Sequence, residues 1–247
     1  MIATRMIDNL RYLLLQVRDP DDPMHRQEVG CFARALRCDE ERIGVLDLLN
    51  AAPDKRQLNA VDMVLLGGSG NYSAIDDGAW VEPALDGLRL VHELSKPTFA
   101  SCWGFQAMAR AMGGEVVNDL DRAELGTHEL RLTSAGRRDP VFGPLKDVFQ
   151  GQMGHEDCVV RLPRDATLLA STRRVENQAY RFEGRPIYCT QFHPELNRAN
   201  LLERVVAYPH YVNRIAGMTL EKFAQMCQDT PETEALLRRI VDHVFPT

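Results

Sequence analysis

The 247-residue sequence predicts an α/β fold: an open, mostly parallel sheet with helices on both faces, extra antiparallel strands and a helical C-terminal tail. Short apolar runs bounded by Gly, Pro and Asp, typical of strands buried on both faces, alternate with segments of helical period. Such alternation favours parallel strands joined by right-handed crossovers. After Gly114 the apolar segments are shorter and partly alternating, which predicts antiparallel or mixed strands beside the parallel core.

The first half of the chain supplies the predicted parallel strands and their helices. Helical segments are expected at residues 25–36 and 80–94, because apolar residues recur there at i, i+3, i+4 and i+7. A third helix, Phe105–Met112, is expected to end at Gly113 or Gly114. The four apolar runs are "YLLLQV", "IGVLDLL", "VDMVLLGG" and "KPTFAS", at residues 12–17, 43–49, 61–68 and 96–101.

The second half adds the predicted antiparallel strands and then the tail. Beyond His193 the pattern turns helical, and Thr230 and Pro231 suit the N-cap and first position of a last helix. We expect one compact domain over residues 1–196, with a helical extension over residues 197–247 packed on it. The strand segments are "THELRLT", "DCVVRLP", "TLLAST", "QAYRFEG" and "PIYCTQF", at residues 127–133, 157–163, 167–172, 178–184 and 186–192.

Composition excludes several classes of protein. No run approaches the roughly 18 apolar residues of a membrane-spanning helix, and Arg5, Asp8 and Arg11 interrupt the N-terminal apolar positions. These features predict a cytoplasmic protein without a signal peptide or membrane partner. The net charge of −6, with no basic stripe, argues against a nucleic-acid partner. Six scattered cysteines without a CxxC pair predict reduced thiols, and we expect neither a metal site nor a cofactor.

Cys102 lies where a predicted strand turns into a helix, in "FASCWGFQAMARAMGG". Open α/β sheets bind ligands at this carboxyl end of their strands. Ala100 and Gly104 are small enough for a sharp strand-to-helix elbow, and a helix N-terminus favours the thiolate. This segment predicts an activated nucleophile, although it is equally consistent with a buried structural thiol.

A base for that nucleophile is offered by "TQFHPE", residues 190–195. Pro194 biases His193 towards an extended conformation, so that Glu195, two residues on, points the same way and reaches the imidazole. The carboxylate would fix the tautomer and leave the other ring nitrogen to exchange a proton with Cys102. The alternative is a surface histidine beside a solvated glutamate, and the presence of both halves of one mechanism favours the catalytic interpretation.

The glycine-rich stretch "LLGGSGNYSA", residues 65–74, follows the third predicted strand. Its glycines allow backbone N–H groups to approach a ligand, and with the N–H of Trp103 they would stabilise the oxyanion of a tetrahedral intermediate. A phosphate loop is less consistent, because the stretch lacks GK[ST] and a complete G-x-G-x-x-G. A plain turn is the remaining alternative.

These motifs together resemble a known family. Cys102, Gly104 and Gln106 match the C-x-G-x-Q of the class I (triad) glutamine amidotransferases, "HPE" at residues 193–195 matches their second signature, and "GGSG" at residues 67–70 resembles their oxyanion loop. The similarity is closest to stand-alone members resembling the amidotransferase domain of GMP synthetase, and it spans Leu13 to Leu196. It implies a class I glutamine amidotransferase-like fold, with residues 1–196 as the amidotransferase domain.

The resemblance also implies an activity. Cys102 would attack the side-chain amide of L-glutamine, His193 would pass the proton to departing ammonia, and Glu195 would orient His193. Water would hydrolyse the thioester to glutamate, and ammonia would pass to a separate synthetase. Glu156 departs from the family by replacing the glycine of its S-H-G-D segment. The remaining implied roles are an oxyanion hole at Gly68 and Trp103, and substrate binding by Gly70, Gln106, His155 and Asp157.

Two further functions are consistent with the sequence. A stand-alone γ-glutamyl hydrolase or peptidase would apply the same thioester chemistry to a γ-glutamyl conjugate. A catalytically silent binding protein that kept the fold is the other, and the intact Cys102, His193 and Glu195 weigh against it.

Overall fold

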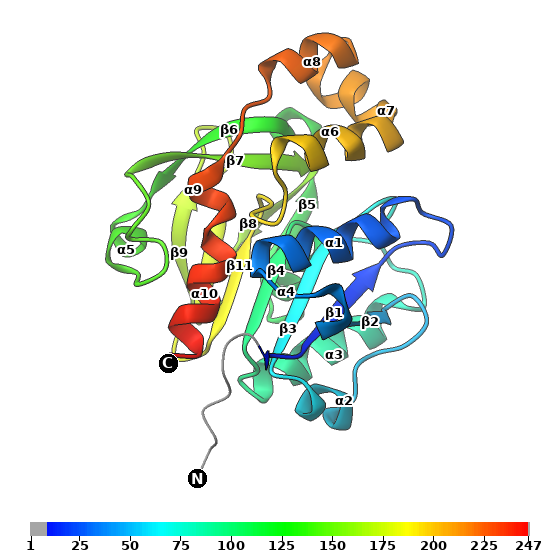
Figure 1. The fold of residues 1–247 in the computed structure, drawn as a ribbon, viewed down its shortest axis with the longest axis vertical. Helices are drawn as coiled ribbons and strands as arrows, with labels where there is room; N and C mark the ends of the chain where they lie inside the picture. The colour runs from blue at the N-terminus through cyan, green and yellow to red at the C-terminus, as the bar shows by residue number, and fades with distance from the viewer. Residues whose placement is uncertain (1–8, 247) are drawn as a thin grey trace.

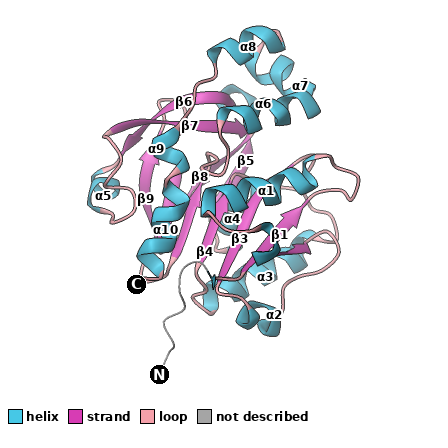
Figure 2. Ribbon diagram, viewed as in Figure 1, coloured by secondary structure: helices cyan, strands magenta, loops and turns pink. Residues whose placement is uncertain are grey.

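The computed structural model of the protein describes residues 9–246, and it has the predicted α/β class (Figure 1). One mixed sheet runs through the centre, with helices on both of its faces (Figure 2). Arg5 and Asp8, which entered the prediction of a cytoplasmic location, lie outside the described residues. None of the helices in residues 9–246 is long and apolar enough to cross a membrane.

The parallel half of the sheet comes from the four apolar runs of the first half of the chain. They form β1 (Tyr12–Val17), β2 (Ile43–Asp47), β3 (Met63–Ser69) and β4 (Thr98–Ser101) in the order β2-β1-β3-β4. A fifth strand, β11 (Ile187–Thr190), pairs in parallel with β4, and Thr190 lies opposite Ser101. This pairing brings the segment before Cys102 next to the segment before His193, although 91 positions separate the two residues.

The antiparallel half continues the sheet from β11. It consists of β10 (Ala179–Phe182), β9 (Ala166–Ser171), β6 (Glu124–Leu132) and β7 (Val148–His155), in that order. The predicted strand at residues 157–163 forms β8 (Asp157–Arg161), which pairs with β5 (Glu115–Asn118) in a separate two-stranded sheet. The sequence analysis missed β5 and β7, because β5 is short and β7 contains two glycines and two glutamines that weaken the apolar pattern.

Helices cover both faces of the central sheet. α1 (Met24–Leu36) packs with α10 (Leu236–Val244) on one face, and α3 (Val81–Glu93) packs with α4 (Trp103–Ala111) on the other. α4 begins two residues before the predicted Phe105, directly after Cys102. The remaining elements outside the tail are η2 (Glu40–Arg42), α2 (Lys55–Ala60), η3 (Leu120–Arg122) and α5 (Ser134–Arg138).

The C-terminal segment is helical, as predicted, and has two parts. α6 (Arg198–Ala207), α7 (Pro209–Tyr211), the π-helical turn η4 (Val212–Ala216) and α8 (Leu220–Met226) lie together at one end of the molecule (Figure 1). α9 (Pro231–Glu234) begins at Pro231, but the Thr230 side chain makes no capping hydrogen bond. α10 places Leu237 and Ile240 in the core beside Phe32 of α1. A domain boundary at residue 196 stays a prediction.

Gly104 is required by the close approach of α4 to β3. A Cβ at this position would overlap the Cβ of Leu66 and lie 3.3 Å from the Cβ of Ala100. We therefore expect Gly104→Ala to lower the free energy of unfolding by about 1–3 kcal/mol in urea titrations, the usual cost of overpacking a core. Gly44→Ala on β2 is the control, because its Cβ would meet atoms only at 3.8 Å and beyond. Equal losses in the two variants would contradict this account.

Candidate active site

Cys102 is the single residue between β4 and α4. Its backbone has φ 51° and ψ −107°, a conformation that side chains other than glycine adopt rarely. Its N–H donates a hydrogen bond of 2.9 Å to the carbonyl of Thr190 on β11, which holds the turn in place. The sharp elbow expected around a nucleophile is therefore present, and Cys102 as a whole residue is 8% exposed.

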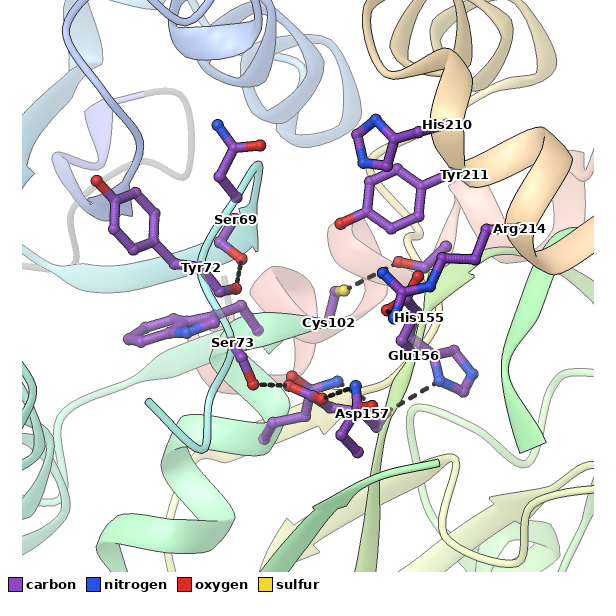
Figure 3. Close-up of a pocket in the computed structure, with 15 residues that line it drawn as sticks. Ser69, Tyr72, Ser73, Cys102, His155, Glu156, Asp157, His210, Tyr211 and Arg214 are labelled. Carbon is purple, nitrogen blue, oxygen red and sulfur yellow. Dashed lines mark hydrogen bonds and ion pairs between the residues drawn. The ribbon is translucent and has the colours of Figure 1, made fainter. Parts of the chain in front are cut away.

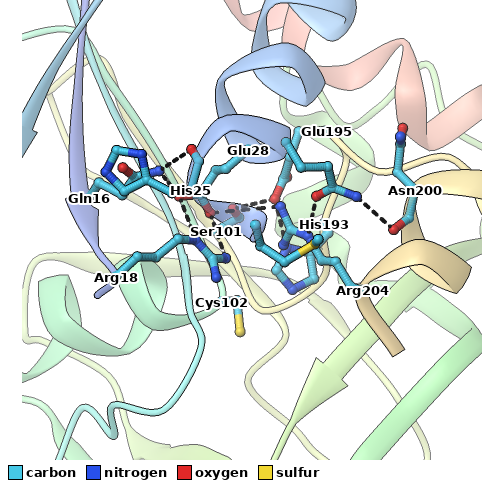
Figure 4. A network of polar contacts seen from close by, with 12 residues as sticks. Gln16, Arg18, His25, Glu28, Ser101, Cys102, His193, Glu195, Asn200 and Arg204 are labelled. Atoms are coloured by element: carbon cyan, nitrogen blue, oxygen red, sulfur yellow. Dashed lines mark hydrogen bonds and ion pairs between the residues drawn. The ribbon is translucent and has the colours of Figure 1, made fainter. Parts of the chain in front are cut away.

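His193 and Glu195 follow the end of β11 and form a buried pair. His193 Nδ1 lies 2.6 Å from Glu195 Oε1, and Ser101 Oγ donates to the same oxygen at 3.0 Å (Figure 4). Arg34 donates to the Glu195 backbone carbonyl at 2.7 Å, and the backbone N–H of His193 donates to the backbone carbonyl of Gln152 at 2.9 Å. Because Nδ1 is engaged, Nε2 is the ring nitrogen left to exchange a proton with Cys102.

The charges of this pair stabilise each other against burial. Burial lowers the pKa of His193, but the Glu195 carboxylate and the neighbouring Cys102 raise it to about 9. Burial alone would raise the pKa of Glu195, yet the His193 imidazolium, with a smaller contribution from Arg204, holds it below its usual value. The pair therefore favours the imidazolium form of His193 and the ionised form of Glu195.

Gly68 and Trp103 lie beside this pair. A Cβ on Gly68 would be 3.2 Å from His193 Cε1 and 3.7 Å from Cys102 Cβ, so the backbone of β3 faces Cys102 and His193 here. Trp103 is the first residue of α4, and the first N–H groups of a helix have no partner within it. Both residues predicted for an oxyanion hole thus flank Cys102.

A polar cavity of about 220 Å³ opens on one side of Cys102 (Figure 3). Three of the four residues predicted to bind substrate, Gln106, His155 and Asp157, line it. Their polar atoms are largely engaged with the protein. Gln106 Nε2 donates to the carbonyl of Asp157 at 3.0 Å, and His155 Nδ1 makes a 3.0 Å hydrogen bond with the same carbonyl.

The carboxylate of Asp157 ties the cavity walls together. One oxygen accepts from Ser73 Oγ at 2.5 Å and from the Ala74 N–H at 3.1 Å, and the other accepts from Asn118 at 2.9 Å. Asp157 thereby holds the loop after β3 against β5, and this loop forms part of the same wall.

Gly70, the fourth residue predicted to bind substrate, does not line this cavity. A Cβ on Gly70 would be 2.7 Å from Tyr208 Oη and 2.8 Å from Asp22 Oδ2, and its carbonyl accepts from Tyr211 Oη at 3.1 Å. Gly70 therefore contacts the tail, and direct contact with substrate stays a prediction for it.

Two charged residues of the cavity were not predicted as site residues. Arg214 of η4 lies 3.3 Å from Glu156, and Figure 3 shows both at the edge of the cavity with Tyr211. Glu156 Oε1 is buried and has no hydrogen-bond partner among the described residues. In the sequence, Glu156 stood out only because it replaces the glycine of the S-H-G-D segment. No motif marks Arg214, which reaches the site only through the folding of the tail.

A buried ionic network lies behind the His193–Glu195 pair (Figure 4). Arg18 donates to Glu28 at 3.1 and 3.2 Å and to Asp22 at 3.0 Å, and Arg204 of α6 lies 3.7 Å from Glu28. This network was not predicted, because its members come from the loop after β1, from α1 and from α6, and no local pattern joins them. It connects the tail to the centre of the site.

A second, smaller cavity of about 60 Å³ lies on the other side of Cys102. His193 and Gly68 line it from the sheet side, and Leu201, Val205 and Tyr208 line it from the tail. Within residues 9–246 no cluster of three or more His, Cys, Asp or Glu side chains is arranged to hold a metal ion.

Selective alkylation is expected at Cys102. Burial raises the pKa of Cys31 and Cys38 to about 11 and that of Cys158 and Cys189 to about 12, and it also raises the pKa of Cys227. Cys102 instead pairs with the His193 side chain and lies directly before α4. At pH 7.5 iodoacetamide should modify Cys102 at least about tenfold faster than the half-buried Cys38, as followed by peptide mass spectrometry. Equal rates, or a rate at Cys102 unaffected by His193→Asn, would contradict this pairing.

The chain is similar to known proteins in sequence. The family model described as "Glutamine amidotransferase class-I" matches residues 32–203. A GMP synthase (glutamine-hydrolyzing) of Christiangramia forsetii is 40% identical over 100 residues, which are 40% of this chain and 19% of that protein. Gamma-glutamyl peptidase 3 of Arabidopsis thaliana is 28% identical over 188 residues, covering 73% of this chain and 71% of that protein.

The fold is also found among solved structures. A crystal structure of a glutamine amidotransferase from Thermotoga maritima superposes with a TM-score of 0.76 at 18% identity, covering 96% of this chain and 99% of that one. The chain spans only 19% to 29% of the length of the GMP synthases with which it was compared.

Proposed function

The chain belongs to the class-I glutamine amidotransferase family, and we propose that it hydrolyses the side-chain amide of L-glutamine to glutamate and ammonia through a thioester on Cys102. The observation that carries this proposal is the arrangement of three side chains. A strained cysteine at a strand-to-helix elbow lies beside a buried histidine, whose far nitrogen is 2.6 Å from a buried glutamate. Such a nucleophile, base and orienting carboxylate suit acyl transfer.

In the first step Cys102 Sγ forms a bond to the amide carbon of glutamine. The thiol proton resides on His193 Nε2, because Glu195 holds the opposite nitrogen and stabilises the imidazolium. The carbonyl oxygen becomes an oxyanion, which the backbone N–H groups of Gly68 and Trp103 stabilise. These donors belong to the rigid end of β3 and the first turn of α4, so they need little reorganisation.

In the second step His193 gives its proton to the amide nitrogen, the carbon–nitrogen bond breaks and ammonia leaves. Water then attacks the thioester, giving one proton to His193 as its oxygen bonds to the carbon. Collapse of this second tetrahedral species releases glutamate, and the proton on His193 again balances the Cys102 thiolate. Over the cycle one water is consumed, and glutamate and ammonia are formed.

The polar cavity suits the charged end of glutamine. Its wall carries Glu156, with an unpartnered buried oxygen, and Arg214, and these supply a negative and a positive group for the α-ammonium and α-carboxylate. Gln106 and His155 shape the wall, and Asp157 fixes the loop after β3. Gly70 supports the same loop through its contact with Tyr211.

Ammonia released here would pass to a separate synthetase. The GMP synthases with which the chain was compared are much longer than the matched region, so their synthetase part has no counterpart in the match. Residues 1–196 would form the amidotransferase domain, and residues 197–247 would form an extension that covers its site.

A second candidate is hydrolysis of a γ-glutamyl conjugate. It is favoured by the similarity to gamma-glutamyl peptidase 3, which covers 73% of this chain and 71% of that protein. The two activities share the thioester and differ in the leaving group.

Steady-state product analysis tests the proposal. The purified protein is expected to release equal amounts of ammonia and glutamate from L-glutamine. Release of an amine or amino acid from a γ-glutamyl conjugate, without turnover of glutamine, would replace the proposed function by the second candidate.

A further inference from the structure

Two cavities meet at Cys102 and differ in size and chemistry. The larger, polar cavity of about 220 Å³ contains Glu156, Asp157 and Arg214, whereas the smaller one of about 60 Å³ contains His193 and the apolar side chains Leu201 and Val205. A substrate acylating Cys102 therefore has two directions in which its two ends can lie.

The position of His193 assigns these directions. His193 must protonate the leaving nitrogen, and it lines the smaller cavity but not the larger one. The charged glutamyl end needs partners for its ammonium and carboxylate, and the larger cavity provides them. The leaving group therefore enters the smaller cavity.

The smaller cavity has little room and firm walls. An apolar protein cavity of about 150 Å³ binds one benzene molecule, which has six carbon atoms, so about 60 Å³ has room for only two or three non-hydrogen atoms. Val205 is 3% exposed and Leu201 is 2% exposed. Tyr208 is fixed through its hydroxyl, which lies 2.5 and 2.6 Å from the oxygens of Asp22 and accepts from Arg18 at 3.0 Å.

Two arginines, Arg18 and Arg204, line this cavity, and they bear on leaving groups that carry a carboxylate. Arg18 uses four of its five N–H donors on Glu28, Asp22 and Tyr208. Arg204 donates through Nε to Gln27 and lies 3.7 Å from Glu28, and its Nη2 has no hydrogen-bond partner among the described residues. Arg204 lines the same small cavity, so a carboxylate that paired with it there would have to fit within about 60 Å³.

We infer that Val205, Leu201 and Tyr208 of the tail set an upper limit on the size of the leaving group, so that the enzyme accepts ammonia and excludes amino acids and peptides. This inference rests on the proposed function and deepens it, because it separates glutamine from larger γ-glutamyl amides. Val205 and Leu201 are specificity-determining residues in this account, and they take no part in proton transfer.

The test compares kcat/KM for L-glutamine, γ-glutamylmethylamide, γ-glutamylethylamide and γ-glutamylglycine. For the wild type the values should fall in that order, with a loss of at least about tenfold from glutamine to the ethylamide. Val205→Ala should raise the ratio of ethylamide to glutamine at least about tenfold, and Leu201→Ala should act in the same direction. The ratio does not depend on the fraction of enzyme that is folded, since both substrates report on the same sample.

Val206→Ala is the matched control, because Val206 is the next residue of α6 and is 61% exposed. It should leave the ratio unchanged. Turnover of γ-glutamylglycine as fast as glutamine, lost in Arg204→Gln, would overturn the inference and assign Arg204 to carboxylate binding. The inference would also be overturned if Val205→Ala and Leu201→Ala turned over glutamine with an unchanged ratio of ethylamide to glutamine. That result would leave the proposed function intact. If the enzyme turns over none of the four substrates, both the proposed function and this inference are overturned.

Discussion

Cys102→Ala is expected to lower kcat for glutamine hydrolysis by about 10⁴-fold or more, because no other group in the site can form the thioester. The effect should appear in kcat and kcat/KM alike, since the thiol acts in the transition state and contributes little to binding of the ground state. Stopped assays of glutamate and ammonia measure the loss, and the bound glutamine can be detected separately by calorimetry.

Two comparisons exclude a structural cause. Cys38→Ala removes a half-buried thiol far from the cavities and should retain activity, and a thermal melt of Cys102→Ala should show a folded protein. Cys102→Ser keeps the size of the side chain but replaces a thiol by a much less acidic hydroxyl, so it should be nearly as inactive as the alanine variant. Substantial activity in Cys102→Ala would refute the covalent mechanism.

Glu195→Gln is expected to lower kcat by about 10²- to 10⁴-fold and to change its dependence on pH. His193 must be an imidazolium to protonate the leaving ammonia, and its pKa of about 9 predicts a wild-type kcat/KM that falls as the pH rises above about 9. Burial by itself lowers the pKa of this histidine, and the Glu195 charge is the largest influence that raises it. Without that charge the pKa of His193 falls, so the alkaline limb of the profile should move to lower pH.

Glu124→Gln provides a matched control for this shift. Glu124 is also a buried carboxylate beside a histidine, with 3.3 Å between its Oε2 and His155 Nε2, but it does not contact His193. Its variant can alter KM through the cavity wall, yet the alkaline limb should keep its position. An identical shift in both variants would show that the limb reports on something other than the His193–Glu195 pair.

The sequence predicted those parts of the site that local chemistry determines. The elbow at Cys102 follows from small residues between a strand and a helix, and the His193–Glu195 contact follows from an extended segment imposed by Pro194. Glu28, Arg204 and Arg214 could not be predicted in this way, because each is an ordinary charged position on a helical segment. They become site residues only when α1, α6 and η4 pack around the end of the sheet.

The same distinction explains the fold. Continuous apolar runs such as Tyr12–Val17 predicted the parallel strands well, because strands buried on both faces have a strong pattern. β7 escaped prediction, because Gln150, Gly151, Gln152 and Gly154 interrupt the apolar pattern. Its position in the sheet depends on pairing with β6, which is a tertiary contact.

The pairing of β4 with β11 also has a consequence for how the enzyme acquires activity. The two strands are joined by a long intervening chain, which contains six other strands of the fold and must be closed into a loop before Thr190 can lie opposite Ser101. Closing such a loop costs conformational entropy, and folds rich in distant contacts form slowly. The nucleophile and its base therefore do not meet in any locally folded fragment. The chemistry proposed for Cys102 therefore requires the complete sheet, and a fragment that lacks β11 would carry the cysteine without its partner.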